Sequence, residues 1–236
     1  AGLRPAIDYI AAHHEVRDVL LTGGDPLLLS DGALDALLGE LRAIPHVEIV
    51  RINTRIPIFL PQRIDGALVD TLKRHHPLWI NVHVNHPKEL APEARAAITR
   101  LADAGIPLGS QSLLMAGIND CPNVFRSLVH QLVALRVRPY YLYQCDPVLG
   151  SSHFVAPVDK GLDIIDALRG HTSGLCVPVF VIDAPGGGGK VALQRHAIVG
   201  HTADRVLLRT YEGDVVTYHQ PRGYQSHGAA TCGYCA

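Results

Sequence analysis

The sequence predicts an α/β protein in which parallel strands alternate with helices. Short apolar runs alternate with amphipathic segments from residue 18 to residue 171, and polar residues follow almost every apolar run. Of the 236 residues, 47% are hydrophobic, which is enough for a sizeable core. Strands joined by helical crossovers run parallel, so the pattern fits both a doubly wound sheet and a barrel.

The expected elements follow one another at regular spacing. A helix opens the chain at residues 3–16. Strands are then expected at 18–26, 47–55, 78–86, 106–115 and 138–146, and helices at 30–44, 65–75, 91–105, 123–137 and 158–171. Ser30 is a suitable N-cap for the helix that follows it, and Gly105 is suited to end the helix that precedes it.

The pattern changes after about residue 175. A strand over 176–183 leads into a glycine-rich loop, and residues 204–221 read as a hairpin turned by "YEGD". The tail at 224–236 is polar and has no periodicity. We therefore expect two domains, residues 1–175 with the strand–helix units and residues 176–236 with the loop, the hairpin and the tail.

Composition excludes several classes of partner. A formal net charge of −1 argues against a surface for nucleic acid or anionic membranes, and no apolar run approaches the roughly 20 residues of a membrane span. The five cysteines form an odd set without a secretion signal, so we expect a reducing, cytoplasmic location. Because the chain opens directly in an expected helix, we also expect it to be an internal piece of a longer protein.

Four glycines, Gly186, Gly187, Gly188 and Gly189, directly precede Lys190. A nucleotide P-loop is excluded, because Ala184 replaces its first glycine and Val191 replaces the hydroxyl that would hold magnesium. Two interpretations remain. The segment is either a flexible surface loop, or a loop that grips the phosphate of a cofactor to which Lys190 is joined as a Schiff base.

Polar residues gather where the expected strands end. They are Gly23, Gly24 and Asp25; Asn53 and Arg55; His83, Asn85 and His86; Gln111; Tyr143 and Asp146; and Asp183. The carboxyl ends of parallel strands share one face, so these residues indicate a common ligand site.

The strings "LLTGGDPLLLSD", "NTRIPIFLPQRI", "NVHVNHPKEL", "PLGSQSLLMAGINDC", "RPYYLYQCD" and "APGGGGK" occur in this order. Together they resemble the lysine 2,3-aminomutase family of the radical S-adenosylmethionine superfamily, over almost the whole chain. The resemblance implies a partial (β/α)6 TIM-like barrel of the radical S-adenosylmethionine type that lacks its first strand. A C-terminal strand, a hairpin and a zinc-binding tail would follow.

The resemblance also implies roles for individual residues. Gly23, Gly24 and Asp25 match the turn that binds the methionyl end of S-adenosylmethionine, and His83 and Gln111 match positions that contact the same cofactor. Lys190 matches the lysine that carries pyridoxal phosphate, and the four glycines would fold around its phosphate. Tyr143, Asp146 and Asp183 match the substrate pocket, where both aspartates would hold the ε-ammonium of lysine. A turn-forming role for Asp183 before Pro185 is the alternative.

The metal sites are implied less completely. The spacing of Cys232 and Cys235 alone suits either a redox pair or half of a zinc site. The resemblance implies a structural zinc held between subunits by Cys121, Cys232 and Cys235, although Ala230 replaces a family cysteine and His227 is a candidate fourth ligand. The Cys-x3-Cys-x2-Cys triad that ligates the [4Fe–4S] cluster is absent from the sequence and lies upstream in the family.

The implied activity is a radical amino migration that converts L-lysine to β-lysine in a homo-oligomer, a dimer or tetramer. We expect the chain as given to be inactive alone. Glutamate 2,3-aminomutase and a lysine isomerase acting for a translation factor are related alternatives. The alternative outside the enzymes is a non-catalytic module that binds pyridoxal phosphate or a nucleotide.

Overall fold

The chain forms two compact units in a computed structural model that describes residues 3–146, 148–195 and 197–221. The units are Ala1–Leu193 and Gln194–Ala236. The division falls later than the change in sequence pattern near residue 175. The reason is that the strands on both sides of the glycine loop pair with the large sheet of the first unit.

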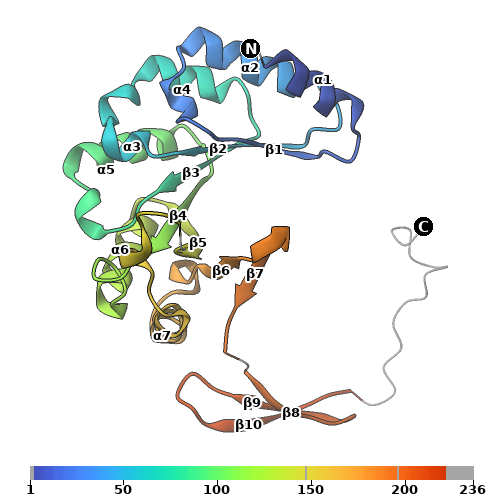
Figure 1. The fold of residues 1–236 in the computed structure, drawn as a ribbon, viewed down its shortest axis with the longest axis vertical. Coiled ribbons are helices and arrows are strands. Elements are labelled where there is room, and N and C mark those ends of the chain that lie inside the picture. Colours follow the sequence, from blue (N-terminus) through green and yellow to red (C-terminus); the bar gives the residue numbers. More distant parts are fainter. Residues whose placement is uncertain (1–2, 147, 196, 222–236) are drawn as a thin grey trace, which may run out of the picture. The chain divides into compact units, whose positions relative to one another are not determined.

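The first unit is built on a seven-stranded sheet (Figure 1). Its strands lie in chain order: β1 Asp18–Leu21, β2 Ile49–Thr54, β3 Leu78–His83, β4 Leu108–Leu114, β5 Val137–Gln144, β6 Val179–Asp183 and β7 Lys190–Leu193. β1 to β6 are parallel, and β7 runs antiparallel to β6. The predicted parallel α/β architecture is confirmed, and the sequential strand order excludes a doubly wound sheet.

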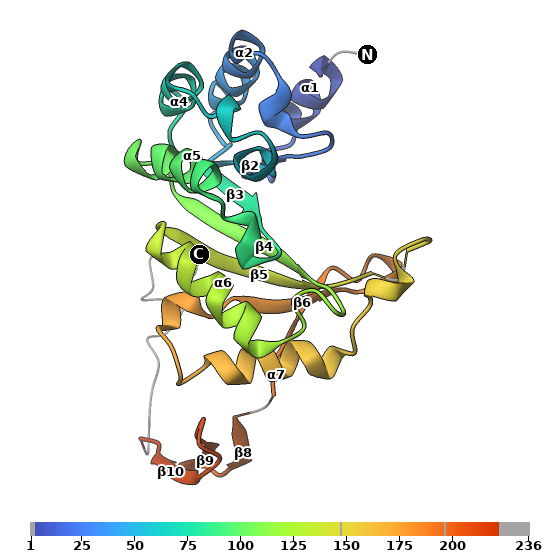
Figure 2. The ribbon, with the colours of Figure 1, turned by 90° about the vertical axis from the view of Figure 1, so that its left-hand side faces the viewer.

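Helices connect the parallel strands and cover one face of the sheet. They are α1 Arg4–Ala12, α2 Asp31–Arg42, α3 Ile56–Phe59, α4 Gly66–Lys73, α5 Pro92–Asp103, α6 Pro122–Ala134 and α7 Val158–Leu168. Short 3-10 turns lie at Pro26–Leu28, Pro61–Arg63, Pro87–Glu89, Ser152–Phe154, Gly174–Cys176 and Pro185–Gly187. The sheet curls away from these helices, so its other face is concave (Figures 1 and 2).

The ends of the helices follow from local sequence. Ser30 accepts a hydrogen bond from the backbone N–H of Ala33 at 3.3 Å and caps α2, as predicted. Gly105 ends α5 with a φ of 78°, a value that glycine adopts without strain. α6 stops at Ala134, earlier than expected, because the backbone turns at Arg136 with a φ of 62°.

Side chains alternate between the two faces of the sheet. In β3, Leu78, Ile80 and Val82 are fully buried in the hydrophobic core, which lies under the helices. Trp79 and His83 occupy the alternate positions, and His83 lines a cavity on the other face. The same strands therefore supply the core with one set of side chains and the concave face with another.

The second unit contains a three-stranded antiparallel sheet. Its strands are β8 Ile198–His201, β9 Arg205–Arg209 and β10 Val215–His219, and β9 lies in the middle. The turn between β9 and β10 is closed by a bond of 2.8 Å from the backbone N–H of Thr210 to the carbonyl of Asp214. Gly213 has a φ of 95° in this turn.

None of the helices in the described part of the chain combines the length and the apolar composition needed to cross a membrane.

Candidate functional site

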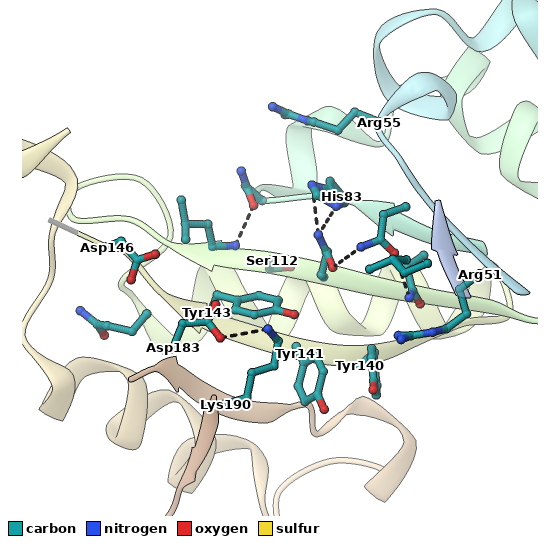
Figure 3. Close-up of a pocket in the computed structure, with 17 residues that line it drawn as sticks. Arg51, Arg55, His83, Ser112, Tyr140, Tyr141, Tyr143, Asp146, Asp183 and Lys190 are labelled. Atoms are coloured by element: carbon teal, nitrogen blue, oxygen red, sulfur yellow. Dashed lines mark hydrogen bonds and ion pairs between the residues drawn. The ribbon is translucent and has the colours of Figure 1, made fainter. Parts of the chain in front are cut away.

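The concave face of the first unit contains a cavity of about 630 Å³ near the carboxyl ends of the parallel strands. Figure 3 shows the side chains that converge on it. Among the residues singled out from the sequence, those lining the cavity are Asn53, Arg55, His83, Asn85, Gln111, Tyr143, Asp146, Asp183 and Lys190. Asn53 and Lys190 are 137 positions apart in the sequence and line the same cavity. They meet because the carboxyl ends of parallel strands lie at the same edge of the sheet.

Lys190 lies directly opposite Asp183 in the antiparallel pair of β6 and β7. Its Nζ is 2.9 Å from Oδ1 of Asp183, and both side chains are 44% exposed (Figure 3). The hydrogen bond to Asp183 raises the pKa of Lys190, more than burial lowers it. The pair is therefore a carboxylate and an ammonium in direct contact.

The glycines close the hairpin that makes this contact. Gly186, Gly187 and Gly189 have φ values of 73°, 81° and 74°, which side chains disfavour. The backbone N–H of Ala184 donates to the carbonyl of Gly189 at 2.8 Å. All four glycines are exposed and lie outside the residues that line the cavity. In this structure their function is to turn the chain so that Lys190 returns to the site.

Tyrosine rings form one wall of the cavity beside Lys190. Nζ of Lys190 is 5.3 Å from the centroid of the Tyr143 ring, within the range of a cation–π contact. The rings of Tyr141 and Tyr143 meet edge to face, with centroids 5.5 Å apart. Burial raises the pKa of Tyr143, so its hydroxyl stays protonated at neutral pH.

A chain of amide hydrogen bonds crosses three strands toward His83. Nδ2 of Asn81 donates to Oδ1 of Asn53 at 3.2 Å, and Nδ2 of Asn53 donates to Oε1 of Gln111 at 3.3 Å. The amide nitrogen of Gln111 then faces the His83 ring and is bonded to it. Burial, and secondarily the charge of Arg55, lower the pKa of His83. The ring is thus neutral, and its nitrogen accepts the bond from Gln111.

The turn after β1 forms a second part of the site. The carboxylate of Asp25 accepts bonds from the Thr54 hydroxyl at 2.7 and 2.9 Å, from the Arg55 N–H at 2.7 Å and from the Leu27 N–H at 3.1 Å. Gly23 has a φ of 113°, which explains the need for glycine there. Gly24 is exposed in the same turn.

A second cavity of about 510 Å³ lies beside this turn and is lined by Gly23, Asp25 and Phe59. Asn53, Arg55 and His83 line both cavities. The guanidinium of Arg55 lies 4.0 Å from the centroid of the Phe59 ring. The two cavities therefore adjoin, with a cationic side chain at their shared wall.

Sequence reasoning missed several side chains that line the main cavity, namely Arg51, Asn81, Tyr140 and Tyr141. They lie within strands and not at strand ends. Arg51 forms an ion pair of 2.9 Å with Asp18 across β1 and β2. The alternation of polar and apolar residues in 50–54 and 80–83 is a signal that could have revealed Arg51 and Asn81.

The predicted zinc site between subunits stays a prediction, because only Cys121 of its expected ligands lies in the described part of the chain. Cys121 is exposed at the N-cap of α6, whereas Cys232 and Cys235 lie outside the described residues. Within 3–146, 148–195 and 197–221, no three His, Cys, Asp or Glu residues are grouped so that they could hold a metal ion.

A family model described as lysine-2,3-aminomutase matches residues 165–234. The chain is 56% identical over 219 residues to L-lysine 2,3-aminomutase of Clostridium subterminale, covering 93% of this chain and 53% of that protein. It is 53% identical over 230 residues to the enzyme of the same name from Acetoanaerobium sticklandii, covering 98% of this chain and 55% of that protein. The chain belongs to the lysine 2,3-aminomutase family.

A glutamate 2,3-aminomutase of Clostridioides difficile is less similar to this chain. It is 46% identical over 216 residues, which are 92% of this chain and 51% of that protein. The chain spans about half the length of the curated family members that it matches.

The fold of this lysine 2,3-aminomutase family member is also found in a protein of low sequence identity. The crystal structure of Streptococcus suis SuiB matches with a TM-score of 0.58 at 11% identity, covering 78% of this chain and 44% of SuiB. SuiB bound to S-adenosylmethionine matches with a TM-score of 0.52 at 12% identity, covering 71% and 39%. At this level of identity the likeness concerns the curled α/β architecture alone.

Proposed function

We propose that the full-length protein is an isomerase that converts L-lysine to β-lysine, an L-lysine 2,3-aminomutase. The observation that carries the proposal is the identity of 50–56% to five proteins of that name over at least 93% of this chain. The glutamate 2,3-aminomutase, at 46%, is the less similar relative.

The charges of the main cavity support lysine as the substrate. Asp146 and Asp183 both line it, and Figure 3 shows both carboxylates directed into it. Carboxylates that face one cavity favour cations there; Lys190 already pairs with Asp183, and a second cation would compensate Asp146. The ε-ammonium of lysine supplies such a cation and glutamate does not. Tyr143 lies in the same cavity and is the third residue that we assign to the substrate pocket.

The site fits pyridoxal phosphate at Lys190. Its amine projects into a cavity of about 630 Å³ with a tyrosine face beside it, and a glycine hairpin holds it there. When attached as a Schiff base, pyridoxal phosphate supplies a conjugated ring that delocalises electrons from the attached group. Lys190 would hold the cofactor and Tyr143 would pack against it. Gly186, Gly187, Gly188 and Gly189, which lie outside the lining of the cavity, would shape the hairpin that carries Lys190.

The second cavity fits the methionyl part of S-adenosylmethionine. The turn at Gly23 to Asp25 presents backbone groups, and Arg55, which follows β2, adds a cationic side chain to the same cavity. These groups suit the amine and carboxylate of an amino acid. His83 and Gln111, joined by their hydrogen bond, offer polar groups at the adjoining wall. The fold shared with SuiB, which has been determined with S-adenosylmethionine, supports this assignment.

The five cysteines of this chain do not fit an iron–sulfur cluster, because no three of them have the Cys-x3-Cys-x2-Cys spacing. We assign the [4Fe–4S] ligands to another part of the full-length protein, together with the strand that would extend the sheet into a (β/α)6 barrel of the radical S-adenosylmethionine type. We also propose that the exposed Cys121 joins Cys232 and Cys235 of another subunit around zinc in a homo-oligomer.

The full-length protein is incubated under anaerobic conditions with pyridoxal phosphate, S-adenosylmethionine and a reductant. The amino acid products formed from lysine and from glutamate are then measured. We expect β-lysine from lysine, no comparable turnover of glutamate, and a borohydride-fixed cofactor on Lys190. Lys190→Arg keeps the charge but cannot form the imine, so it is the matched control. Equal turnover of glutamate would exclude a lysine enzyme. A fixed label without turnover of either substrate would favour a non-catalytic binding module.

A further inference from the structure

Asn81 lies at the start of the chain of amide hydrogen bonds that ends at His83. It is 7% exposed and sits inside β3, two positions before the strand ends. It lines the main cavity and also a third cavity of about 300 Å³. A buried amide with no charge of its own therefore lies under the polar groups that face a ligand.

Strand register places the members of this chain opposite one another. Asn53 of β2 is the register partner of Asn81 of β3. His83 of β3 is likewise the register partner of Gln111 of β4. Asn81 and His83 are two positions apart in one strand, so their side chains share the concave face. The amide of Asn53 bonds to Asn81 and also reaches across β3 to Gln111. The contacts thus follow from backbone pairing.

Gly109 determines which end of the Asn81 amide faces the chain. It is the register partner of Asn81 in β4, and a Cβ at this position would lie 2.3 Å from Oδ1 of Asn81. The amide oxygen therefore occupies the space that a side chain would take, and Nδ2 is left to donate to Asn53. The next nearest atoms, Cγ of Asn81 and Cβ of Tyr140, are at ordinary contact distances of 3.5 and 3.6 Å.

The direction set at Asn81 passes along the chain, because each amide that accepts at its oxygen donates from its nitrogen. Asn53 accepts from Asn81 and donates to Oε1 of Gln111. The nitrogen of Gln111 is then the atom bonded to the His83 ring. A donor at a ring nitrogen opposes protonation of that nitrogen. The neutral ring accepts there and carries its proton on the other nitrogen, which becomes a donor.

We propose that Asn81, held in place by Gly109, is a positioning residue for His83 and Gln111. It fixes the direction of the Gln111 amide and, through it, which nitrogen of the His83 ring carries the proton. The ring can then donate to an acceptor atom of the ligand. This role rests on the proposed function of the pair, which assigns both residues to S-adenosylmethionine.

The first experiment measures the pKa of the His83 ring without any ligand. Deuterium exchange at the C2 carbon of the ring is followed across pH by mass spectrometry of the full-length protein. Asn81→Leu removes the donor and Gly109→Ala displaces it, and neither variant adds a charge. We expect both to raise the pKa of His83 by about 0.5–1 unit, the equivalent of one neutral hydrogen bond. The reason is that Gln111 becomes free to turn its oxygen toward the ring.

The charges that act on the ring stay the same in both variants. They are Arg55, at the end of β2, and Asp25, in the turn after β1. Tyr140→Phe is the matched control, because Tyr140 lines the same two cavities as Asn81 and lies outside the chain of amides. It should leave the pKa of His83 at the wild-type value. An unchanged pKa in both Asn81→Leu and Gly109→Ala, or an equal rise in Tyr140→Phe, would overturn the proposal.

The second experiment titrates the full-length protein with S-adenosylmethionine in a calorimeter. We expect Asn81→Leu to raise the Kd at least roughly fivefold, as the loss of one hydrogen bond implies. Asn81→Asp should raise it further, because a carboxylate only accepts and so reverses the direction of the chain. A raised pKa of His83 with an unchanged Kd would overturn the use of this arrangement for the ligand. Wild-type protein without measurable binding would refute the proposed function, and the pKa experiment would still decide the role of Asn81.

Discussion

The hydroxyl of Thr54 donates to both carboxylate oxygens of Asp25, at 2.7 and 2.9 Å. Thr54 is only 1% exposed at the end of β2, and Asp25 lies in the turn that follows β1. The backbone N–H of Arg55 donates to the same carboxylate at 2.7 Å. Because a charged acceptor strengthens these bonds, they lock the glycine turn to the neighbouring strand.

Replacing Thr54 by valine keeps the shape of the side chain and removes this donor. We expect a loss of about 1–3 kcal/mol in the free energy of unfolding, the usual range for a hydrogen bond to a charged group or a buried group left unpaired. S-adenosylmethionine should also bind more weakly, because the turn at Gly23 loses its anchor. Urea unfolding and calorimetric titration measure the two effects. Thr54→Ser retains the hydroxyl, so a serine variant as weak as the valine variant would contradict the explanation.

Asp146→Asn tests the substrate pocket. We expect kcat/KM for lysine to fall at least roughly tenfold, which corresponds to a loss of about 1.4 kcal/mol in transition-state stabilisation. The reason is that a substrate ammonium would lose one of its carboxylate partners. Steady-state kinetics of the full-length protein give the ratio, and absorbance at a fixed pH reports whether the cofactor is still attached. Unchanged lysine kinetics in a variant with normal absorbance would remove Asp146 from the substrate site.

Gly161 in α7 lies directly on the ring of Phe180 in β6. A Cβ at this position would overlap three ring carbons, and Phe180 is buried at 1% exposure, so the ring has no free space to move into. We expect Gly161→Ala to cost about 1–3 kcal/mol, the usual effect of overpacking a core.

The control for Gly161→Ala is Gly32→Ala in α2, where nothing lies within 4 Å of the added atom. Its stability should be unchanged or slightly higher, because alanine favours the helix. Urea unfolding of both variants makes the comparison. Equal stability of the two variants would show that the contact with Phe180 does not constrain α7.

His83 should make stability depend on pH. Burial and the nearby Arg55 lower the pKa of its ring in the folded state, although the carboxylate of Asp25 opposes them. In the unfolded chain the ring titrates near its ordinary value of about 6.5. Below that pH the ring is protonated in the unfolded state but still neutral in the folded state. The free energy of unfolding should therefore decrease as the pH falls from about 7 toward the lowered pKa.

The measurement for His83 compares unfolding free energies at pH 7.5 and 5.5 for wild type and His83→Gln. We expect wild type to lose more stability over this interval than the variant, since glutamine does not titrate. An NMR titration of the His83 ring gives its pKa directly. Identical losses in the two proteins would show that His83 does not couple folding to pH.

Much of the architecture was predictable, because the helical and strand periods are strong signals in a sheet covered by helices. The polar residues at strand ends also indicated one shared site, and His83, Gln111 and Lys190 do line one cavity. Site residues inside strands were not found, because Asn81 and Arg51 look like ordinary polar positions when only strand ends are considered. Their contacts with Asn53 and Asp18 depend on how neighbouring strands align.

The strand β7 and the pairing of Lys190 with Asp183 were not predicted either. Consecutive glycines have no side-chain pattern, so the sequence did not distinguish a loose loop from a tight hairpin. The segment forms a tight hairpin because the backbone of Lys190–Leu193 pairs with β6. The same pairing moves the division between the compact units beyond Leu193.

The strictly sequential order of the seven strands has a consequence for biosynthesis. Each strand pairs with the strand translated just before it, so the sheet can grow by addition at one edge as the ribosome delivers the chain. β7 is added last of the seven, and it begins with Lys190. The amine of Lys190 is therefore translated after the tyrosines of β5 that line the cavity beside it. A nascent chain that stalls before Lys190 would have this part of the cavity without its lysine.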